Sequence, residues 1–347
     1  MASILYVATD EGVVTLKSAD GHNWKQEHHG LKDWQIPEVA VSPNAANKVF
    51  AGTRGDGVWV SEDFGATWKK PCYGKRGPGK VRCLSFDPHD ASTLYAGTEP
   101  IDVFVTHDEA KSWDRLDTVW NIPWVSTVTY PVAAVEPHVR DITIDPNNSQ
   151  IMYVALQVGY MLKTIDGGKS WELLNKNLDC DVHTIVLHPE DSNKIFIATG
   201  GHDCRAGKAP GRALYSSNDG GNNWAPMAME FKEEYSVPLT VHPAKHDVLY
   251  SAVANGQPGQ WRKRNSGAEA FLIQSTDAGK SWKKLDGAVS QANSSFVESF
   301  AFDPANANNM YAAQRSGDLF GSDDSGASWF KLNVNVPELS DMKAAVA

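Results

Sequence analysis

The sequence has few cysteines, no long hydrophobic run and fewer basic than acidic residues. Four Cys among 347 residues do not form a disulfide framework, which favours a reducing compartment and predicts a cytoplasmic protein. No apolar run approaches the roughly 20 residues of a membrane span, and the start, MASILYVATDEGVV, lacks the basic and apolar regions of a signal peptide. With 42 acidic against 32 basic residues the net charge is −10, which argues against a general nucleic-acid or membrane binder.

Tryptophan, by contrast, is abundant, and seven of the twelve Trp residues close similar peptides of seven or eight residues. The clearest is SEDFGATW, ending at Trp68; the others end at Trp24, Trp113, Trp171, Trp224, Trp282 and Trp329. Successive Trp are 44 to 58 residues apart, which is the size of a four-stranded propeller blade with some longer loops. Paired apolar segments recur in the same phase, as in LSFDP (84–88) followed by LYAGT (94–98), and their alternation predicts strands.

These repeats predict an all-β fold, a seven-bladed β-propeller of four-stranded antiparallel blades, as a single domain over 1–347. The chain enters at ILYVA (4–8), which resembles the second strand of a blade with no first strand before it. The final residues, DMKAAVA (341–347), supply a strand without a blade. We therefore expect the two ends to pair, which would close the ring and remove two open sheet edges.

The Trp-ended peptides resemble the Asp-box, or BNR repeat. The resemblance covers essentially the whole chain and is to the Asp-box β-propellers: sialidases, xyloglucan hydrolases, sortilin-type receptors and photosystem II assembly factors. The residues themselves indicate a scaffold, because the Asp carboxylate can accept backbone N–H groups in the turn, Gly can adopt a positive φ, and Trp can pack between sheets. The copy ending at Trp113 keeps Asp108 but has Ala110 in place of Gly.

The resemblance implies a fold more than an activity. Sialidases carry an Arg-Ile-Pro motif on six blades, whereas this chain has Gln35-Ile36-Pro37 and seven repeats, so sialidase activity is not expected. Xyloglucan hydrolases use two propellers, and sortilin-type receptors are larger and disulfide-bonded. Photosystem assembly factors match in blade number and act as protein-binding scaffolds.

Arginine is concentrated in the loops of one predicted face. Nine of the ten Arg residues fall there or at the adjoining strand ends: Arg54, Arg76, Arg82, Arg140, Arg205, Arg212, Arg262, Arg264 and Arg315. Because the guanidinium group suits bidentate recognition of carboxylate or phosphate, this face is expected to bind a small polar or anionic molecule. The alternative is a set of solvated charges paired with neighbouring acids.

Polar residues also begin the first strand of several predicted blades, where they should ring the mouth of the central channel. The candidate catalytic residues are His183, His138, His202, Glu298 and Glu38. The candidate substrate-binding residues are Arg54, Arg82, Arg140, Arg315, Glu99, Trp124, Tyr130 and Trp261. Arg, His and carboxylate together suit acid–base chemistry, and exposed aromatic rings suit stacking on a sugar. A closed salt-bridge network, with aromatic side chains capping the blade ends, is the alternative.

A metal site is a third interpretation of the same loops. Cys180-x-x-His183 and His202-Asp203-Cys204 supply two Cys and two His, which suit zinc in type and number although neither spacing is a finger motif. The set His138, His183, His202 and Asp203 would suit a harder ion. No motif in the sequence requires a cofactor. The Cys and His residues nevertheless leave a bound divalent metal as an open alternative.

Two functions remain in view. The first is a hydrolase or lyase acting on a small polar or anionic, carbohydrate-like substrate at the channel mouth; no G-x-S-x-G nucleophile motif occurs. The second is a non-catalytic scaffold that binds a protein partner through the same face, with loop Trp and Tyr residues as the contact points. A closed propeller needs no partner for stability, so a monomer is expected.

Overall fold

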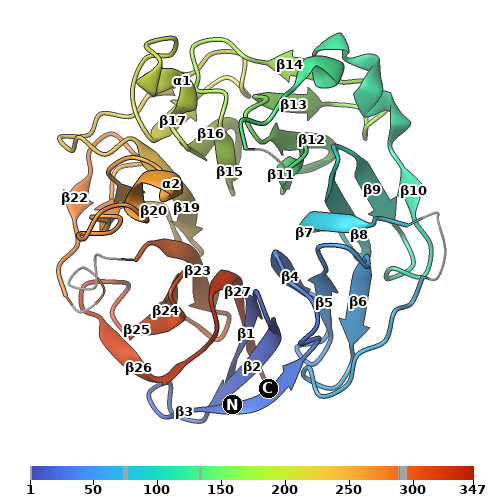
Figure 1. The fold of residues 1–347 in the computed structure, drawn as a ribbon, viewed down its shortest axis with the longest axis vertical. Helices are drawn as coiled ribbons and strands as arrows, with labels where there is room; N and C mark the ends of the chain where they lie inside the picture. Colours follow the sequence, from blue (N-terminus) through green and yellow to red (C-terminus); the bar gives the residue numbers. More distant parts are fainter. Residues whose placement is uncertain (1, 73–76, 133–134, 288, 290–294) are drawn as a thin grey trace. The chain divides into compact units, whose positions relative to one another are not determined.

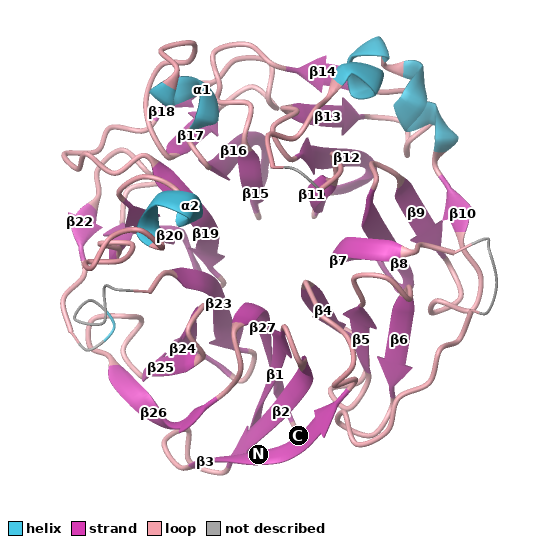
Figure 2. Cartoon of the chain, in the orientation of Figure 1, coloured by secondary structure: helices cyan, strands magenta, loops and turns pink. Residues whose placement is uncertain are grey.

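The computed structural model describes residues 2–72, 77–132, 135–287, 289 and 295–347, and Arg76 lies outside them. The described strands form seven antiparallel sheets, six of four strands and one of three, which the bridge between Val60 and Lys69 extends. This is the seven-bladed β-propeller fold that the sequence predicts (Figure 1). The helices are short and lie in the loops (Figure 2). Among the described residues, no helix is long and apolar enough to cross a membrane.

The seven sheets follow one another along the chain, apart from the last strand, which joins the first sheet. They are β1 (Ser3–Thr9), β2 (Gly12–Ser18) and β3 (Trp24–Gly30) with β27 (Leu339–Val346); β4 (Glu38–Val41), β5 (Val49–Gly52) and β6 (Val58–Ser61); β7 (Lys80–Asp87), β8 (Asp90–Glu99), β9 (Val103–Thr106) and β10 (Asp114–Arg115); β11 (Val139–Asp145), β12 (Asn148–Leu156), β13 (Met161–Thr164) and β14 (Glu172–Leu174); β15 (Val182–His188), β16 (Asp191–Thr199), β17 (Leu214–Ser217) and β18 (Ala225–Pro226); β19 (Tyr235–His242), β20 (Lys245–Ala254), β21 (Phe271–Ser275) and β22 (Lys283–Lys284); and β23 (Val297–Asp303), β24 (Asn306–Gln314), β25 (Asp318–Ser322) and β26 (Phe330–Asn335).

The chain forms two compact units. The first comprises Met1–Arg54, Trp59–Lys70 and Thr240–Ala347, and the second comprises Gly55–Val58 and Pro71–Leu239. In the first unit, β1, β2 and β27 pack their apolar faces against β24 and β25, through residues such as Leu5, Tyr311 and Met342. In the second unit, β8, β9, β11 and β12 share a core that includes Val139 and Val154.

The predicted pairing of the chain ends is confirmed. β27 pairs antiparallel with β1, with Ser3 opposite Val346 and Ala8 opposite Asp341. Beyond the strands, the backbone N–H groups of Ala2 and Ala347 each donate to the carbonyl of the other residue, at 3.1 and 2.9 Å. The last strand therefore completes the first sheet, and one edge of β1 that would otherwise expose its backbone groups is covered.

The Trp-ended peptides form turns held by local hydrogen bonds. In the copy ending at Trp68, the Asp63 carboxylate accepts the Thr67 backbone N–H at 2.9 Å, and the Trp68 indole donates to the Gly65 carbonyl at 3.1 Å. The copy with Ala in place of Gly keeps the same turn, because Ala110 adopts the left-handed φ of 70°. Six of the seven Trp side chains are buried, and that of Trp68 is half-buried. These peptides act as structural turns, as their residues indicate.

Acid is expected to destabilise the protein through these turns. Hydrogen bonds from the Ser170 hydroxyl and backbone hold the pKa of Asp166 at about 2, and Ser281 does the same for Asp277. Because the folded-state pKa lies below the unfolded value of about 4, this contribution is complete above that pH and is lost as the pH falls towards 2. Thermal unfolding measured from pH 5 to pH 2 should show a falling midpoint. The double variant Asp166→Asn, Asp277→Asn should show a shallower fall, and an identical fall would contradict the assignment.

Candidate functional site

The segment between β10 and β11 presents two exposed tryptophans on a packed base. It contains two 3₁₀ helices, η1 (Asp117–Asn121) and η2 (Pro123–Thr127), and Pro123 occupies the first position of η2, where its fixed φ suits helix entry. Val119 and Val125 are buried in the core shared by β11 and β12. Trp120 and Trp124 remain 43% and 37% exposed. This segment is therefore anchored by apolar packing, while its two indole rings remain partly exposed to solvent.

Trp124 is joined to a buried carboxylate through Tyr160. The Trp124 indole donates to the Gly159 carbonyl at 3.1 Å, and its ring lies 5.7 Å from the Tyr160 ring. The Tyr160 hydroxyl donates to Asp203 Oδ2 at 2.8 Å. Tyr160 also has a left-handed φ of 65°, which is uncommon for a bulky residue and is found more often at functional sites. An exposed aromatic face and a polar group thus lie along one chain of contacts.

Helix α1 (His202–Arg205) follows β16 (Figure 1). One buried carboxylate, that of Asp179, holds it in place. Asp179 is fully buried and accepts the backbone N–H groups of Asp181, His202 and Cys204 at 2.9, 3.0 and 2.8 Å. Burial raises the pKa of Asp179, although these N–H groups favour its charged form. The result is a fixed position for α1 against the segment that precedes β15.

This fixed position brings His202 to Cys180 and Asp203. His202 Nδ1 lies 3.5 Å from Cys180 Sγ and 3.4 Å from Asp203 Oδ1. The His202 side chain is partly exposed, whereas Cys180 and Asp203 are buried. Burial and the carboxylates of Asp203 and Asp179 raise the pKa of the Cys180 thiol. We call Trp124, Tyr160, Cys180, His202 and Asp203 the α1 site.

A second polar group lies next to the α1 site. His183 Nδ1 lies 2.6 Å from the Ser236 carbonyl, which can only accept, so Nδ1 carries a proton. His183 Nε2 faces Asp181 Oδ1 at 3.4 Å, and the Gln157 amide donates to the same oxygen. Burial opposes ionisation of Asp181, but the charges of His183, His202 and Arg205 outweigh it and hold its pKa below the usual value. His183 is therefore positioned by buried partners.

Arg82, Glu99, His138 and Tyr130 form a network of their own. Arg82 Nη1 pairs with Glu99 Oε2 at 3.1 Å, and Arg82 Nη2 lies 2.9 Å from His138 Nε2. His138 Nδ1 faces the Glu136 carbonyl at 2.9 Å, so Nδ1 carries the proton and Nε2 accepts from Arg82. The Tyr130 ring packs edge-on against the His138 ring at 5.3 Å. This arrangement favours the closed-network alternative for these four residues.

The remaining candidates are placed separately. Glu298 pairs with Arg315, Glu38 lies 3.3 Å from Lys343 Nζ, and Arg54 donates to Gln35 Oε1 at 2.9 Å, all in the first unit. Arg140 is half-buried on β11 in the second unit.

Trp261 differs from the expectation of an exposed stacking ring. It ends helix α2 (Pro258–Trp261), is only 7% exposed, and stacks on Phe296 at 5.2 Å. Its indole donates to the Asn255 carbonyl at 3.0 Å. Trp261 is therefore a packing residue of its loop, and its ring face is covered by Phe296.

The four predicted metal ligands do not gather as one set. Within the described residues, the ligand atoms of Cys180, His202 and Asp203 lie within 4.8 Å of one another. Cys204 Sγ instead donates to the Gly211 carbonyl at 2.7 Å, and His183 is engaged by Asp181 and Ser236. The described residues bring Cys180 and His202 together with Asp203 rather than with Cys204 and His183.

Sequence reasoning missed Asp179, Asp181 and Tyr160. The stretch LDCDVH (178–183) places two acids around a Cys directly before β15. Acidic residues on both sides of a Cys, directly before an apolar strand, are the signal that could have pointed to Asp179 and Asp181. A charged side chain at such a position is buried only when it has polar partners.

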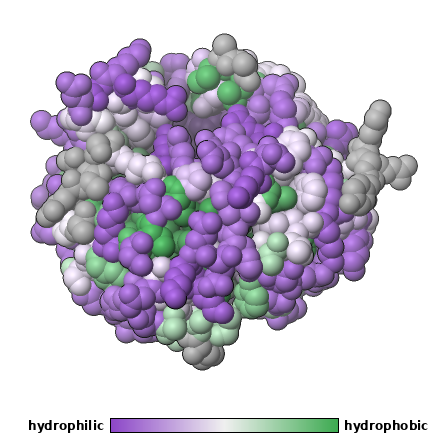
Figure 3. Space-filling view, turned by 60° about the horizontal axis from the view of Figure 1, so that its bottom comes forward, coloured by the Kyte–Doolittle hydropathy of each residue, from purple (hydrophilic) through white to green (hydrophobic). Residues whose placement is uncertain are grey.

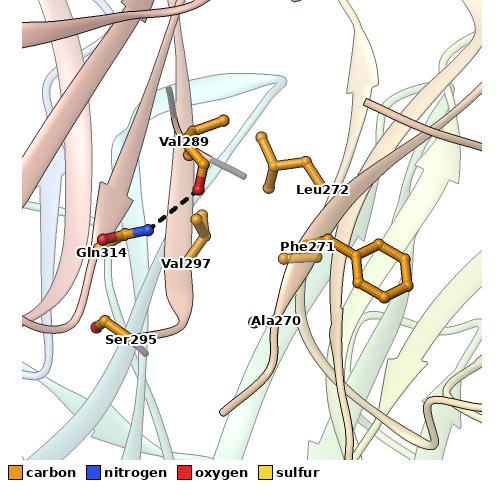
Figure 4. Close-up of a pocket in the computed structure, with 8 residues that line it drawn as sticks. Ala270, Phe271, Leu272, Val289, Ser295, Val297 and Gln314 are labelled. Atoms are coloured by element: carbon orange, nitrogen blue, oxygen red, sulfur yellow. Dashed lines mark hydrogen bonds between the residues drawn. The ribbon is translucent and has the colours of Figure 1, made fainter. Parts of the chain in front are cut away.

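The described residues also line a pocket that is too small for a sugar. Hydrophilic residues cover most of the face displayed in Figure 3, and hydrophobic residues form separate patches. A pocket between β21 and β24 is lined by Leu272, Phe271, Val289, Val297 and neighbours, with Gln314 Nε2 donating to the Val289 carbonyl (Figure 4). Its volume of about 10 Å³ holds one water molecule at most, so it cannot take a sugar.

Parts of the chain are similar to known proteins. The family model of Sortilin-Vps10 (sortilin, neurotensin receptor 3) matches residues 159–272, which include most of the α1 site. An oligoxyloglucan-reducing end-specific xyloglucanase of Emericella nidulans is 35% identical over 83 residues, covering 22% of this chain and 10% of the relative. A probable enzyme of the same name from Neosartorya fischeri is 24% identical over 242 residues, covering 62% and 26%. The chain thus spans about a quarter or less of these curated relatives.

Solved structures share the fold over nearly the whole chain. An ancestral GH74 enzyme has a TM-score of 0.59 at 14% identity, covering 98% of this chain and 40% of that chain. The Niastella koreensis GH74 enzyme has a TM-score of 0.57 at 12% identity, covering 98% and 66%. YCF48 bound to D1 peptide has a TM-score of 0.53 at 17% identity, covering 85% and 81%. At these identities the likeness establishes the fold alone.

Proposed function

We propose that this protein is a hydrolase that acts on a carbohydrate-like substrate at the α1 site. The observation that carries this proposal is the exposed Trp124 ring, which is connected through Tyr160 to the carboxylate of Asp203. Sugar rings have apolar C–H faces that stack on an indole, and their hydroxyls bond to carboxylate and imidazole groups. Trp124 would bind the ring, while Asp203 and the partly exposed His202 contact the polar edge.

The relatives support a hydrolase rather than a lyase. Both curated relatives are named as xyloglucanases, and the longer match spans 62% of this chain. The hydrogen-bonded turns of the Trp-ended peptides also fit the Asp-box propellers, to which we assign the chain. In a hydrolysis, Asp203 and His202 can exchange a proton with the scissile oxygen or with water, because imidazole and carboxylate are the usual general acids and bases.

Activity on a panel of β-linked oligosaccharides that includes oligoxyloglucans tests the proposal. The full chain should release reducing ends, and Trp124→Ala should lower kcat/KM roughly tenfold or more, mainly through KM, because a binding platform is lost. Asp203→Asn should lower kcat. Trp120→Ala is the matched control: its exposed indole donates to Asp102, between β8 and β9, rather than to Gly159, and the activity of this variant should stay near that of the unchanged protein. No cleavage across the panel, or equal activity of the Trp124 variant, would refute the proposal.

A protein-binding scaffold is the second candidate. Trp120, Trp124 and Val132 are all exposed on one segment, and clustered Trp residues are typical of protein contact points. YCF48, whose structure contains a D1 peptide, shares the fold. In this case Trp120→Ala and Trp124→Ala should weaken partner binding alike, whereas Asp203→Asn should leave it unchanged.

A further inference from the structure

Three different ligand atoms meet at one point of the α1 site. Cys180 Sγ comes from the segment before β15, and His202 Nδ1 and Asp203 Oδ1 come from α1. The sulfur–nitrogen distance is 3.5 Å, the nitrogen–oxygen distance is 3.4 Å, and all three atoms lie within 4.8 Å of one another.

Hydrogen bonding accounts for only part of this convergence, because the Cys180 thiol can donate to the Asp203 carboxylate but one contact to His202 is left over. Cys180 Sγ and Asp203 Oδ1 both face the same nitrogen of His202, and one ring nitrogen offers either one proton or one lone pair. A Cys–His–Asp relay for thiol catalysis is also excluded, because there the carboxylate bonds the nitrogen opposite the thiol. A cation placed between the three atoms would contact all of them.

The distances fit a tetrahedral zinc ion. With bonds of about 2.3 Å to sulfur and about 2.0 Å to nitrogen and oxygen, tetrahedral angles place sulfur about 3.5 Å from nitrogen and nitrogen about 3.3 Å from oxygen. The two distances in the structure, 3.5 and 3.4 Å, agree with these edges. Thiolate and imidazole are the donors that zinc prefers over magnesium or calcium.

The surrounding residues also position the donors. Tyr160 bonds Asp203 Oδ2 at 2.8 Å and leaves Oδ1 directed at the other two donors. Asp179 fixes the backbone of α1 through His202 and Cys204. Partners of this kind orient the donors of metal sites. Three protein donors, with His202 partly exposed, leave a fourth position open to water.

We propose that Cys180, His202 and Asp203 bind one thiophilic divalent cation, Zn²⁺ in type, with an open fourth position. The proposal does not depend on the hydrolase function. If both hold, Asp203 and His202 Nδ1 would hold the ion, and a metal-bound water molecule would supply the proton or hydroxide in their place, because metal-bound water is more acidic than free water.

Cobalt substitution tests the site without any use of turnover. The full chain, stripped with a chelator, should take up one equivalent of Co²⁺ and develop thiolate-to-cobalt absorption that Zn²⁺ abolishes. Cys180→Ser should lose this absorption. Cys204→Ser, which changes the neighbouring thiol bonded to Gly211, should keep it. No thiolate absorption in the unchanged protein, or full absorption in Cys180→Ser, would overturn the proposal.

A second variant covers the case in which Cys180→Ser fails to fold. Because the His202 side chain is partly exposed, His202→Gln should fold, and its Zn²⁺ affinity should be at least tenfold weaker by competition with a chelating dye. Unchanged affinity would overturn the site. Metal binding without sugar release would contradict the proposed hydrolase function but support the metal site. Sugar release without metal binding would contradict the metal site but support the hydrolase function.

Discussion

A chain shortened to end at Pro337 is expected to lose its cooperative unfolding transition at temperatures where the full chain is folded. The deletion removes β27, whose Leu339, Met342 and Ala345 are buried and whose backbone pairs with β1 along its length. Burial of one such side chain as large as Met contributes about 2–5 kcal/mol when judged by truncation to Ala. The combined loss is comparable with the whole stability of a typical domain, which is about 5–15 kcal/mol.

Two further measurements sharpen this prediction. Circular dichroism during heating should show a broad transition for the shortened chain, and a synthetic peptide of residues 338–347 added in trans should restore a steep one. Met342→Ala in the full chain should lower the unfolding free energy by about 2–5 kcal/mol, because the side chain is fully buried. A shortened chain that unfolds with the midpoint and steepness of the full chain would show that the terminal pairing contributes nothing.

Among the polar side chains of the α1 site and its supports, Asp179→Asn is expected to be the most damaging single change. Three backbone N–H groups donate to the Asp179 carboxylate, which is fully buried. The amide of the Asn variant has only one oxygen. Its NH₂ group would face backbone N–H groups that need an acceptor. Leaving buried donors unsatisfied costs about 1–3 kcal/mol each, so we expect a loss of about 3 kcal/mol in urea unfolding.

The matched control is Asp191→Asn. Asp191 Oδ1 also accepts a backbone N–H, that of Asn193 at 3.0 Å, but in an exposed turn. Solvent can replace that bond, so the effect should stay within about 0.5 kcal/mol. Equal stability of the two variants would mean that the buried carboxylate does not hold α1.

The fold could be predicted because its determinants are local and repeated. The bond from Thr67 to Asp63 spans four residues and recurs in the other eight-residue peptides, whereas in the seven-residue copy ending at Trp24 it spans three. The pairing of β27 with β1 is distant in sequence, yet it was predictable because the phase of the repeats leaves the first blade without its first strand and leaves one strand without a blade at the C-terminal end.

The site could be predicted only in part, because it lies in loops that do not repeat. His202 and Cys180 were both recognised, but their contact depends on Asp179, which reaches residues more than twenty positions away. Arg82 was expected to bind a ligand. In the structure its guanidinium group contacts His138, which lies 56 positions further along the chain. Loop conformations such as the positive φ of Tyr160 are set by packing, so composition could not reveal them.

The same limit explains Trp261. Its side chain was expected to face solvent because it lies in a long loop between two strands. Its burial depends on a ring stacked from Phe296 and on the short helix α2, neither of which the repeat pattern encodes. Trp124 lies in a similar loop but keeps its ring exposed because the neighbouring Val119 and Val125 supply the packing instead.

The central claim is that the α1 site binds a carbohydrate-like ligand. Amide hydrogen exchange measured with and without an oligosaccharide tests this claim most directly. Mass spectrometry should show slower exchange in residues 117–127 and 199–206 when a cleavable or competing oligosaccharide is bound, and the Trp124→Ala variant should show no such protection. Protection confined to other loops, or none at ligand concentrations that saturate turnover, would contradict the account.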